Sequence, residues 1–197
     1  MNYRAVFALS SVVALSACGI NTIPTAEENA KARWADVQNE YQRRADLIPN
    51  LVNTVKGYAA QEKSVLVDVA EARARATSIQ VTPDQLTDPA KVKQYQDAQN
   101  TLGGTIGRLL SITENYPDLK SNANFLALQS QLEGTENRIT IARRDYNTAV
   151  QQYNTRIRTF PDAIGAKVFY GAKPLVPFQA TTPGAETAPT VNFGNSN

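Results

Sequence analysis

The only cysteine of the chain, Cys18, carries the clearest chemical signal in the sequence. It follows a short polar start with Arg4 and an apolar run from Ala5 to Leu15. The run is too short to span a bilayer and has the length of the central part of a signal peptide. Leu15-Ser16-Ala17-Cys18 has the pattern of a bacterial lipobox, in which the cysteine thiol takes a diacylglyceryl group. The sequence therefore predicts a signal peptide over residues 1–17 and lipidation of Cys18; the alternative is an ordinary signal peptide with a chance cysteine.

A lipidated Cys18 predicts a chain that is stably anchored to a membrane and faces outward. Gly19 and Ile20 follow the cysteine, in place of the acidic residue that retains lipoproteins in the inner membrane. In a cell with two membranes, we therefore expect the periplasmic side of the outer membrane. The sequence leaves open whether the cell has two membranes.

Side chains suited to acid–base or metal chemistry are scarce. The chain has no histidine, which is the commonest general base and metal ligand. No Gly-x-Ser-x-Gly or Ser-x-x-Lys pattern marks a nucleophile. We therefore expect no enzyme, no cofactor and no metal site; a hydrolase with an unrecognised Ser/Lys site is the remote alternative. Removal of residues 1–17 takes away Arg4 and leaves 19 basic against 18 acidic residues, a balance that does not favour binding to nucleic acid.

Two groups of polar residues are the candidate interaction sites. The first group recurs at roughly sevenfold spacing, hence on one face of a long helix: Glu136, Arg143, Asn147 and Asn154. The second surrounds a proline: Arg43, Arg44, Asp46 and Asn50. Each group has two interpretations. It forms either a network that stabilises a helical bundle or a surface that recognises another protein.

These polar residues must be positioned by long amphipathic helices. Every seventh residue from Phe125 is large and apolar, and smaller residues lie between them, which predicts a helix over residues 118–160. The large column is Phe125, Leu132, Ile139, Tyr146, Tyr153 and Phe160; the small one includes Thr135, Ala142 and Ala149.

An earlier apolar stripe runs from Ala30 to Ala59 and passes through Pro49, which removes the helical hydrogen bond to the Ala45 carbonyl. Both a helix kinked near Pro49 and two separate helices fit this pattern, and the unbroken period favours the kinked helix. A further helix is expected to begin near Asp88, with Asp88 as its cap and Pro89 at its first position.

The predicted architecture is all-α, an antiparallel bundle of three to four long helices. Its parts are a tether over residues 18–25, the helical bundle over 26–162, and a segment over 163–179 that folds back on the bundle. Residues 180–197 are rich in Thr, Pro, Ala, Gly and Asn, which predicts a disordered tail.

Several blocks of the sequence resemble the LemA family. They include Arg43 to Val52, Thr54 to Ala59, Tyr116 to Lys120, Thr135 to Ile139, Ala142-Arg143, Tyr146-Asn147, Tyr153-Asn154 and Phe160-Pro161. The resemblance spans roughly residues 34–178, although many members have a transmembrane helix where this chain has a lipobox.

The resemblance implies a small, membrane-anchored, mostly helical protein without an established activity. It also implies membrane zinc metalloproteases or TPM-domain proteins as partners, and an adaptor or scaffold role for a membrane or periplasmic protein. A passive structural spacer in the envelope is the alternative. The oligomeric state stays open.

Overall fold

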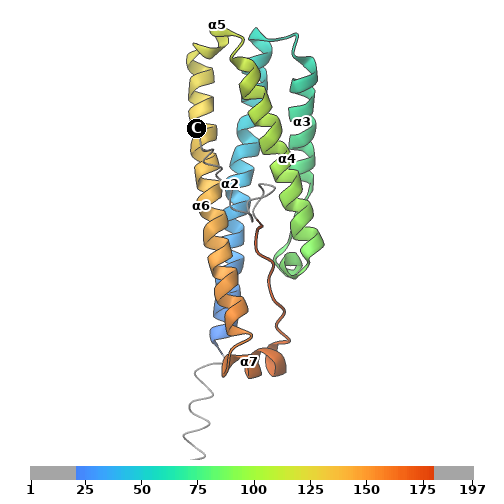
Figure 1. The fold of residues 1–197 in the computed structure, drawn as a ribbon, viewed down its shortest axis with the longest axis vertical. Helices are drawn as coiled ribbons and strands as arrows, with labels where there is room; N and C mark the ends of the chain where they lie inside the picture. The colour runs from blue at the N-terminus through green and yellow to red at the C-terminus, as the bar shows by residue number, and fades with distance from the viewer. Residues whose placement is uncertain (1–20, 180–197) are drawn as a thin grey trace, which may run out of the picture.

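The computed structural model describes residues 21–179, and four long helices dominate it (Figure 1). They are α2 (Thr22–Tyr58), α3 (Lys63–Ser78), α4 (Pro89–Thr113) and α6 (Ala123–Arg156). Successive long helices run in opposite directions along one axis. Residues 21–179 contain no strand, so the predicted all-α bundle is confirmed. Within this range, none of the helices has a stretch long and apolar enough to cross a membrane.

Short elements connect the long helices and close one end of the bundle. They are the 3₁₀ turn η1 (Pro83–Thr87), α5 (Pro117–Lys120), α7 (Asp162–Gly165) and the π-helical turn η2 (Ala166–Tyr170). The predicted cap of α4 is confirmed, because the Asp88 carboxylate accepts hydrogen bonds from the backbone N–H groups of Ala90 and Lys91. After η2, residues 172–179 run back along the bundle without helical structure (Figure 1). We call residues 172–179 the C-terminal strap.

The predicted apolar column of α6 is confirmed over most of its length. Phe125, Leu132, Ile139, Tyr146 and Tyr153 are all buried. The prediction is wrong for Phe160, which is 83% exposed. The helix ends at Arg156, so the period of the helix no longer decides where residue 160 points.

Helix α2 is continuous through Pro49, so the alternative of two separate helices is wrong. The Ala45 carbonyl, which loses its helical donor to Pro49, accepts a hydrogen bond of 2.7 Å from Nε of Arg73 on α3. A neighbouring helix thus replaces the missing bond. The helix begins at Thr22, and Ile23 is buried, so residues 22–25 belong to the bundle and not to the predicted tether.

The core has two halves along the long axis. The aromatic half lies nearer α7 and includes Trp34, Tyr41, Tyr95, Tyr146, Tyr153 and Phe178. The aliphatic half lies nearer α5 and includes Ile48, Leu51, Val55, Val69, Leu102, Leu109 and Leu132. Helices α2, α4 and α6 contribute to both halves, whereas α3 contributes to the aliphatic half and the strap to the aromatic half.

Candidate functional site

A buried arginine lies at the level where the two halves of the core meet. Arg44 on α2 is 3% exposed, and its Nη2 donates to both the backbone oxygen and Oε1 of Gln99, at 2.8 and 2.9 Å. Its Nη1 donates to Oε1 of Glu136 on α6 at 2.8 Å. Burying a guanidinium is costly, and these charge-assisted hydrogen bonds offset that cost. The Arg44 group therefore ties α2, α4 and α6 together with a fixed geometry.

Two neighbours complete the surroundings of Arg44. Its guanidinium lies 5.0 Å from the centre of the Tyr41 ring, a cation–π contact. A Cβ atom at Gly103 on α4 would come within 3.4 Å of Nη1 of Arg44. An alanine at position 103 would thus touch the arginine at the limit of ordinary van der Waals contact, and little space remains there for a longer side chain.

The second part of the site is a pair of asparagines on α6 that bind the strap. Nδ2 of Asn147 donates to the Phe178 carbonyl at 3.0 Å, and Oδ1 of Asn147 accepts from the Phe178 N–H at 2.8 Å. Asn154 makes the same pair of bonds with the backbone of Leu175, at 2.8 and 2.9 Å. Each carboxamide thus pairs with one residue of the strap as a neighbouring β-strand would.

The spacing of the two asparagines matches the spacing of extended chain. Asn147 and Asn154 are seven residues apart on a helix, which corresponds to about 10.5 Å. Leu175 and Phe178 are three residues apart, and three residues of extended chain cover about 10 Å. A heptad of helix is therefore in register with three residues of the strap.

Further contacts secure the strap along its length. The Gln179 carbonyl accepts from Nη2 of Arg143 at 3.0 Å and from Nε2 of Gln96 at 2.7 Å. The Tyr146 hydroxyl donates to the Val176 carbonyl at 2.9 Å. The Phe178 ring stacks on Trp34 with 5.5 Å between ring centres, and the Arg143 guanidinium lies 5.0 Å above the same ring. Side chains and backbone of the strap are thus both held.

The structure places the eight predicted interaction residues in three different surroundings. Arg44 and Glu136, one from each predicted group, form an ion pair. Arg143, Asn147 and Asn154 bind the strap. The remaining three are exposed: Arg43, Asp46 and Asn50.

The two predicted groups therefore do not form two separate surfaces. The Arg44, Arg143, Asn147 and Asn154 side chains are engaged within the chain, and a role of either group in binding another protein stays a prediction.

Sequence reasoning missed several contributors to the site. Gln96 and Gln99 bind the strap and Arg44, respectively, and both are buried polar residues on the apolar face of α4. The sequence indicates such residues only by placing a glutamine among the apolar positions of a helix. Glu62, just before α3, accepts a hydrogen bond from the Tyr116 hydroxyl at 2.9 Å. This bond raises the pKa of Tyr116 above its usual value.

Burial raises the pKa of three tyrosines in the aromatic half. It raises the pKa of Tyr41, against the lowering effect of the nearby Arg143 and Arg44 charges. Burial likewise raises the pKa of Tyr95 and Tyr146. The Tyr146 hydroxyl stays protonated and donates its hydrogen bond to the strap.

Beyond the strap, an open groove continues between α4 and α6. It has a volume of about 610 Å³ and is lined by residues of both helices: Gly103, Ile106, Gly107, Leu110, Leu132, Glu133, Glu136 and Asn137. Gly103 and Glu136 lie one heptad further along their helices than Gln96 and Arg143, which hold the end of the strap. The groove is therefore about 10 Å beyond the end of the strap. A side chain added at Gly107 would meet no atom within 4 Å of its Cβ.

Fold and site define an all-α bundle of four long helices in which an extended C-terminal strap covers part of one side. The chain belongs to the LemA family, whose model matches residues 33–193. The buried arginine, both asparagines and the strap all lie within the matched range.

Several curated relatives are similar to this chain. Magnetosome protein MamQ 2 of Paramagnetospirillum magneticum is 28% identical over 79% of this chain and 64% of its own length. Magnetosome protein MamQ of Magnetospirillum gryphiswaldense is 27% identical over 72% and 58%. Protein LemA of Metamycoplasma hominis is 29% identical over 61% and 51%. The chain thus spans only half to two thirds of the length of these relatives.

Proposed function

We propose that the protein is a non-enzymatic adaptor of the cell envelope, anchored to a membrane through Cys18. Its groove between α4 and α6 binds an extended segment of a membrane or periplasmic protein. Residues 1–20, which include Cys18, lie outside the described residues, so the anchor is carried over from the sequence.

The observation that carries this proposal is the binding of the strap. The same pair of helices already holds one extended segment, through its backbone by Asn147 and Asn154 and through its apolar side chains Leu175 and Phe178. The groove lies one heptad further along the same two helices, beyond the end of the strap. Like the surface that binds the strap, it offers apolar side chains and a carboxamide.

The lining of the groove indicates what kind of segment it suits. Ile106, Leu110 and Leu132 supply an apolar floor, and the glycines of α4 leave room above it. Asn137 supplies a donor and an acceptor at the rim, as Asn147 does for the strap. Glu133 adds negative charge. We therefore expect an extended partner segment with alternating apolar and basic residues.

A crosslinking experiment in cells tests the groove. A photoreactive amino acid replaces the exposed Asn137, and crosslinks are compared in three otherwise identical full chains: wild type at position 107, Gly107→Phe and Gly104→Phe. Gly107 lines the groove, whereas Gly104 is an exposed glycine on the same helix that does not. A Cβ atom added at either position meets no atom within 4 Å.

We expect a crosslink to one envelope protein that falls at least fivefold in Gly107→Phe and persists in Gly104→Phe, with equal melting temperatures. Membrane zinc metalloproteases and TPM-domain proteins are the first partners to probe. A crosslink to residues 180–197 of the same chain would show that the groove serves the chain itself and would overturn the proposal. Equal crosslinking in wild type and Gly107→Phe would favour the passive spacer.

The anchor has a separate test. Metabolic labelling with a fatty acid should mark the wild-type chain and leave the Cys18→Ser chain unlabelled, because the acyl group depends on the cysteine sulfur. Equal labelling of the two chains would contradict the lipid anchor but would not bear on the proposal that the groove binds a partner.

A further inference from the structure

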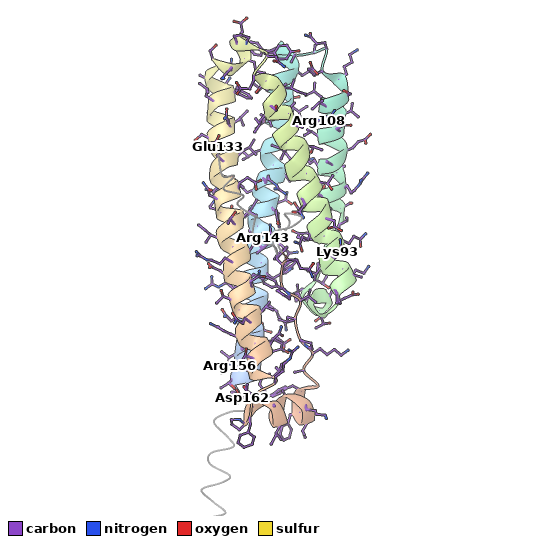
Figure 2. The ribbon with its side chains drawn as sticks, viewed as in Figure 1. Lys93, Arg108, Glu133, Arg143, Arg156 and Asp162 are labelled. Carbon is purple, nitrogen blue, oxygen red and sulfur yellow. The ribbon has the colours of Figure 1, made fainter. Side chains whose placement is uncertain are left out.

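Large apolar side chains are exposed together at one end of the bundle. Five of them lie within eleven residues around α7 and η2: Phe160 (83% exposed), Ile164 (57%), Val168 (68%), Phe169 (67%) and Tyr170 (42%). Figure 2 shows side chains of this end projecting away from the helices. Among the described residues, the other exposed large apolar side chains are scattered along the bundle: Tyr58, Val67, Leu126 and Ile141. We call the five clustered residues the apolar end.

The apolar end is held firmly to the rest of the bundle. Ala166 of η2 is buried in the aromatic half of the core. The Thr22 hydroxyl at the start of α2 donates to Oδ2 of Asp162 at 3.0 Å. A Cβ atom at Gly165 would lie 3.7 Å from the Ile23 side chain. The segment that carries the exposed apolar side chains is therefore fixed to the bundle.

Positive charge surrounds the apolar end. Residues 156–173 contain four exposed basic residues, Arg156, Arg158, Lys167 and Lys173, and one acidic residue, Asp162. Residues 156–173 therefore carry a formal charge of +3, whereas the whole chain carries +2. The first turns of α2 at the same end add Glu27 and Glu28, both paired with Lys31. Figure 2 marks Arg156 and Asp162 at this end. Exposed apolar and aromatic groups beside basic residues are the combination that binds the surface of an anionic bilayer.

The anchored end of the chain enters at the same place. Helix α2 begins at Thr22, beside α7, and Cys18 is only four residues earlier. Four residues reach about 14 Å at most. A lipid on Cys18 would thus keep the apolar end within reach of the bilayer.

We propose that the apolar end is a membrane-docking surface. Phe160, Ile164, Val168 and Phe169 enter the interfacial region of the bilayer, and the basic residues bind anionic lipid headgroups. The bundle then stands on the membrane by two attachments, the lipid and the apolar end, with the α5 end pointing away. This inference rests in part on the proposed anchor at Cys18, and the experiment separates the two.

Quenching by brominated lipids reports directly on insertion. The single native tryptophan, Trp34, is buried in the core and out of reach of lipid. Two full-chain variants each gain one tryptophan at an exposed apolar position: Phe169→Trp in the apolar end and Val67→Trp on α3. Both are measured as lipidated proteins on vesicles of brominated phosphatidylcholine with 30% phosphatidylglycerol.

Flotation with the vesicles reports the lipid anchor independently of the quenching. We expect both variants to float and only Phe169→Trp to lose at least half of its added fluorescence. Two floating variants with equal quenching would overturn docking but leave the anchor in place. Failure of both to float would contradict the anchor and docking alike, because the apolar end by itself should also hold the chain on anionic vesicles.

The soluble arm uses residues 18–197 with Cys18→Ser, which lack the predicted signal peptide, with and without Phe169→Asp. Docking predicts at least a tenfold loss of binding to the anionic vesicles in Phe169→Asp, weaker binding of both chains to pure phosphatidylcholine, and no loss with Val67→Asp as control. A chain that is dimeric in solution, and that Phe169→Asp converts to a monomer without changing vesicle binding, would show instead that the apolar end joins two copies of the protein.

Discussion

The same three long helices, α2, α4 and α6, form both halves of the bundle, but the fourth element differs between the aromatic half and the aliphatic half. In the aliphatic half, α3 packs against α2 and α4. In the aromatic half the strap takes that role, and Phe178 contacts both Trp34 and Tyr146. Figure 1 shows α3 beside one end of the bundle and the extended segment beside the other.

The difference teaches what each kind of element demands of its neighbours. A helix satisfies its own backbone, so α3 needs little more than an apolar stripe to pack against. An extended segment leaves its N–H and C=O groups unpaired, and burying them without partners costs free energy. The aromatic half must therefore supply polar partners, which are Asn147, Asn154, Gln96 and the Tyr146 hydroxyl.

The largest expected effect concerns the centre of the aromatic half. Trp34 contacts the rings of Tyr95, Tyr146 and Phe178, and its Nε1 donates to the Val81 carbonyl at 3.0 Å. Trp34→Ala should lower the free energy of unfolding by roughly 3–5 kcal/mol, because it removes this packing and leaves a cavity. Urea unfolding measures the loss. The exposed Phe160 is the control, and Phe160→Ala should stay within about 0.5 kcal/mol of wild type.

The next largest effect is expected for Arg44, at the boundary between the two halves. Arg44→Met keeps an unbranched chain but leaves the buried oxygens of Gln99 without a donor, so we expect a loss of roughly 2–3 kcal/mol. Because Arg44 joins three helices, the two halves should also unfold less cooperatively, which lowers the apparent m-value. The neighbouring Arg43 is exposed, and Arg43→Met should change little. Equal effects of the two changes would mean that the buried arginine does not couple the halves.

Substituting an asparagine that binds the strap tests the difference between the two halves most directly. Asn147→Ala removes two hydrogen bonds to the backbone of Phe178 and should cost roughly 1–3 kcal/mol. Amide hydrogen exchange should accelerate at Leu175 and Phe178 and stay unchanged in α3. The exposed Gln151 on the same helix is the control, and Gln151→Ala should leave exchange at both sites unaltered. Faster exchange in α3 as well would contradict the division into halves.

The smallest expected effect tests the support of α2 by α3 in the aliphatic half. Arg73→Met removes the donor to the Ala45 carbonyl and should cost about 1 kcal/mol. Pro49→Ala restores a backbone N–H for that carbonyl, so in the Pro49→Ala chain the cost of Arg73→Met should be smaller. Thermal unfolding of the four chains completes the double-mutant cycle. Costs that simply add would show that Arg73 does not replace the bond that Pro49 removes.

The sequence by itself determined most of α4 and α6 and most of the apolar column of α6, because these depend on local periodicity. It did not show that α2 ends at Tyr58 and that α3 begins at Lys63, because the apolar pattern continues across this turn. The column from Phe125 to Tyr153 is buried as its spacing predicts. The Asp88 cap could also be read from sequence, since a capping side chain bonds to backbone only two and three residues away.

Only the tertiary structure decided the partners of the polar residues. A carboxamide on a helix face presents the same donor and acceptor to another helix, to a second protein or to the chain's own strap. The period of α6 therefore placed Asn147 and Asn154 on one face but did not reveal that they bind Phe178 and Leu175. Arg73 similarly reaches Ala45 only because α3 packs against α2. Phe160 lies beyond the end of α6, where the periodicity of the helix no longer sets the direction of a side chain.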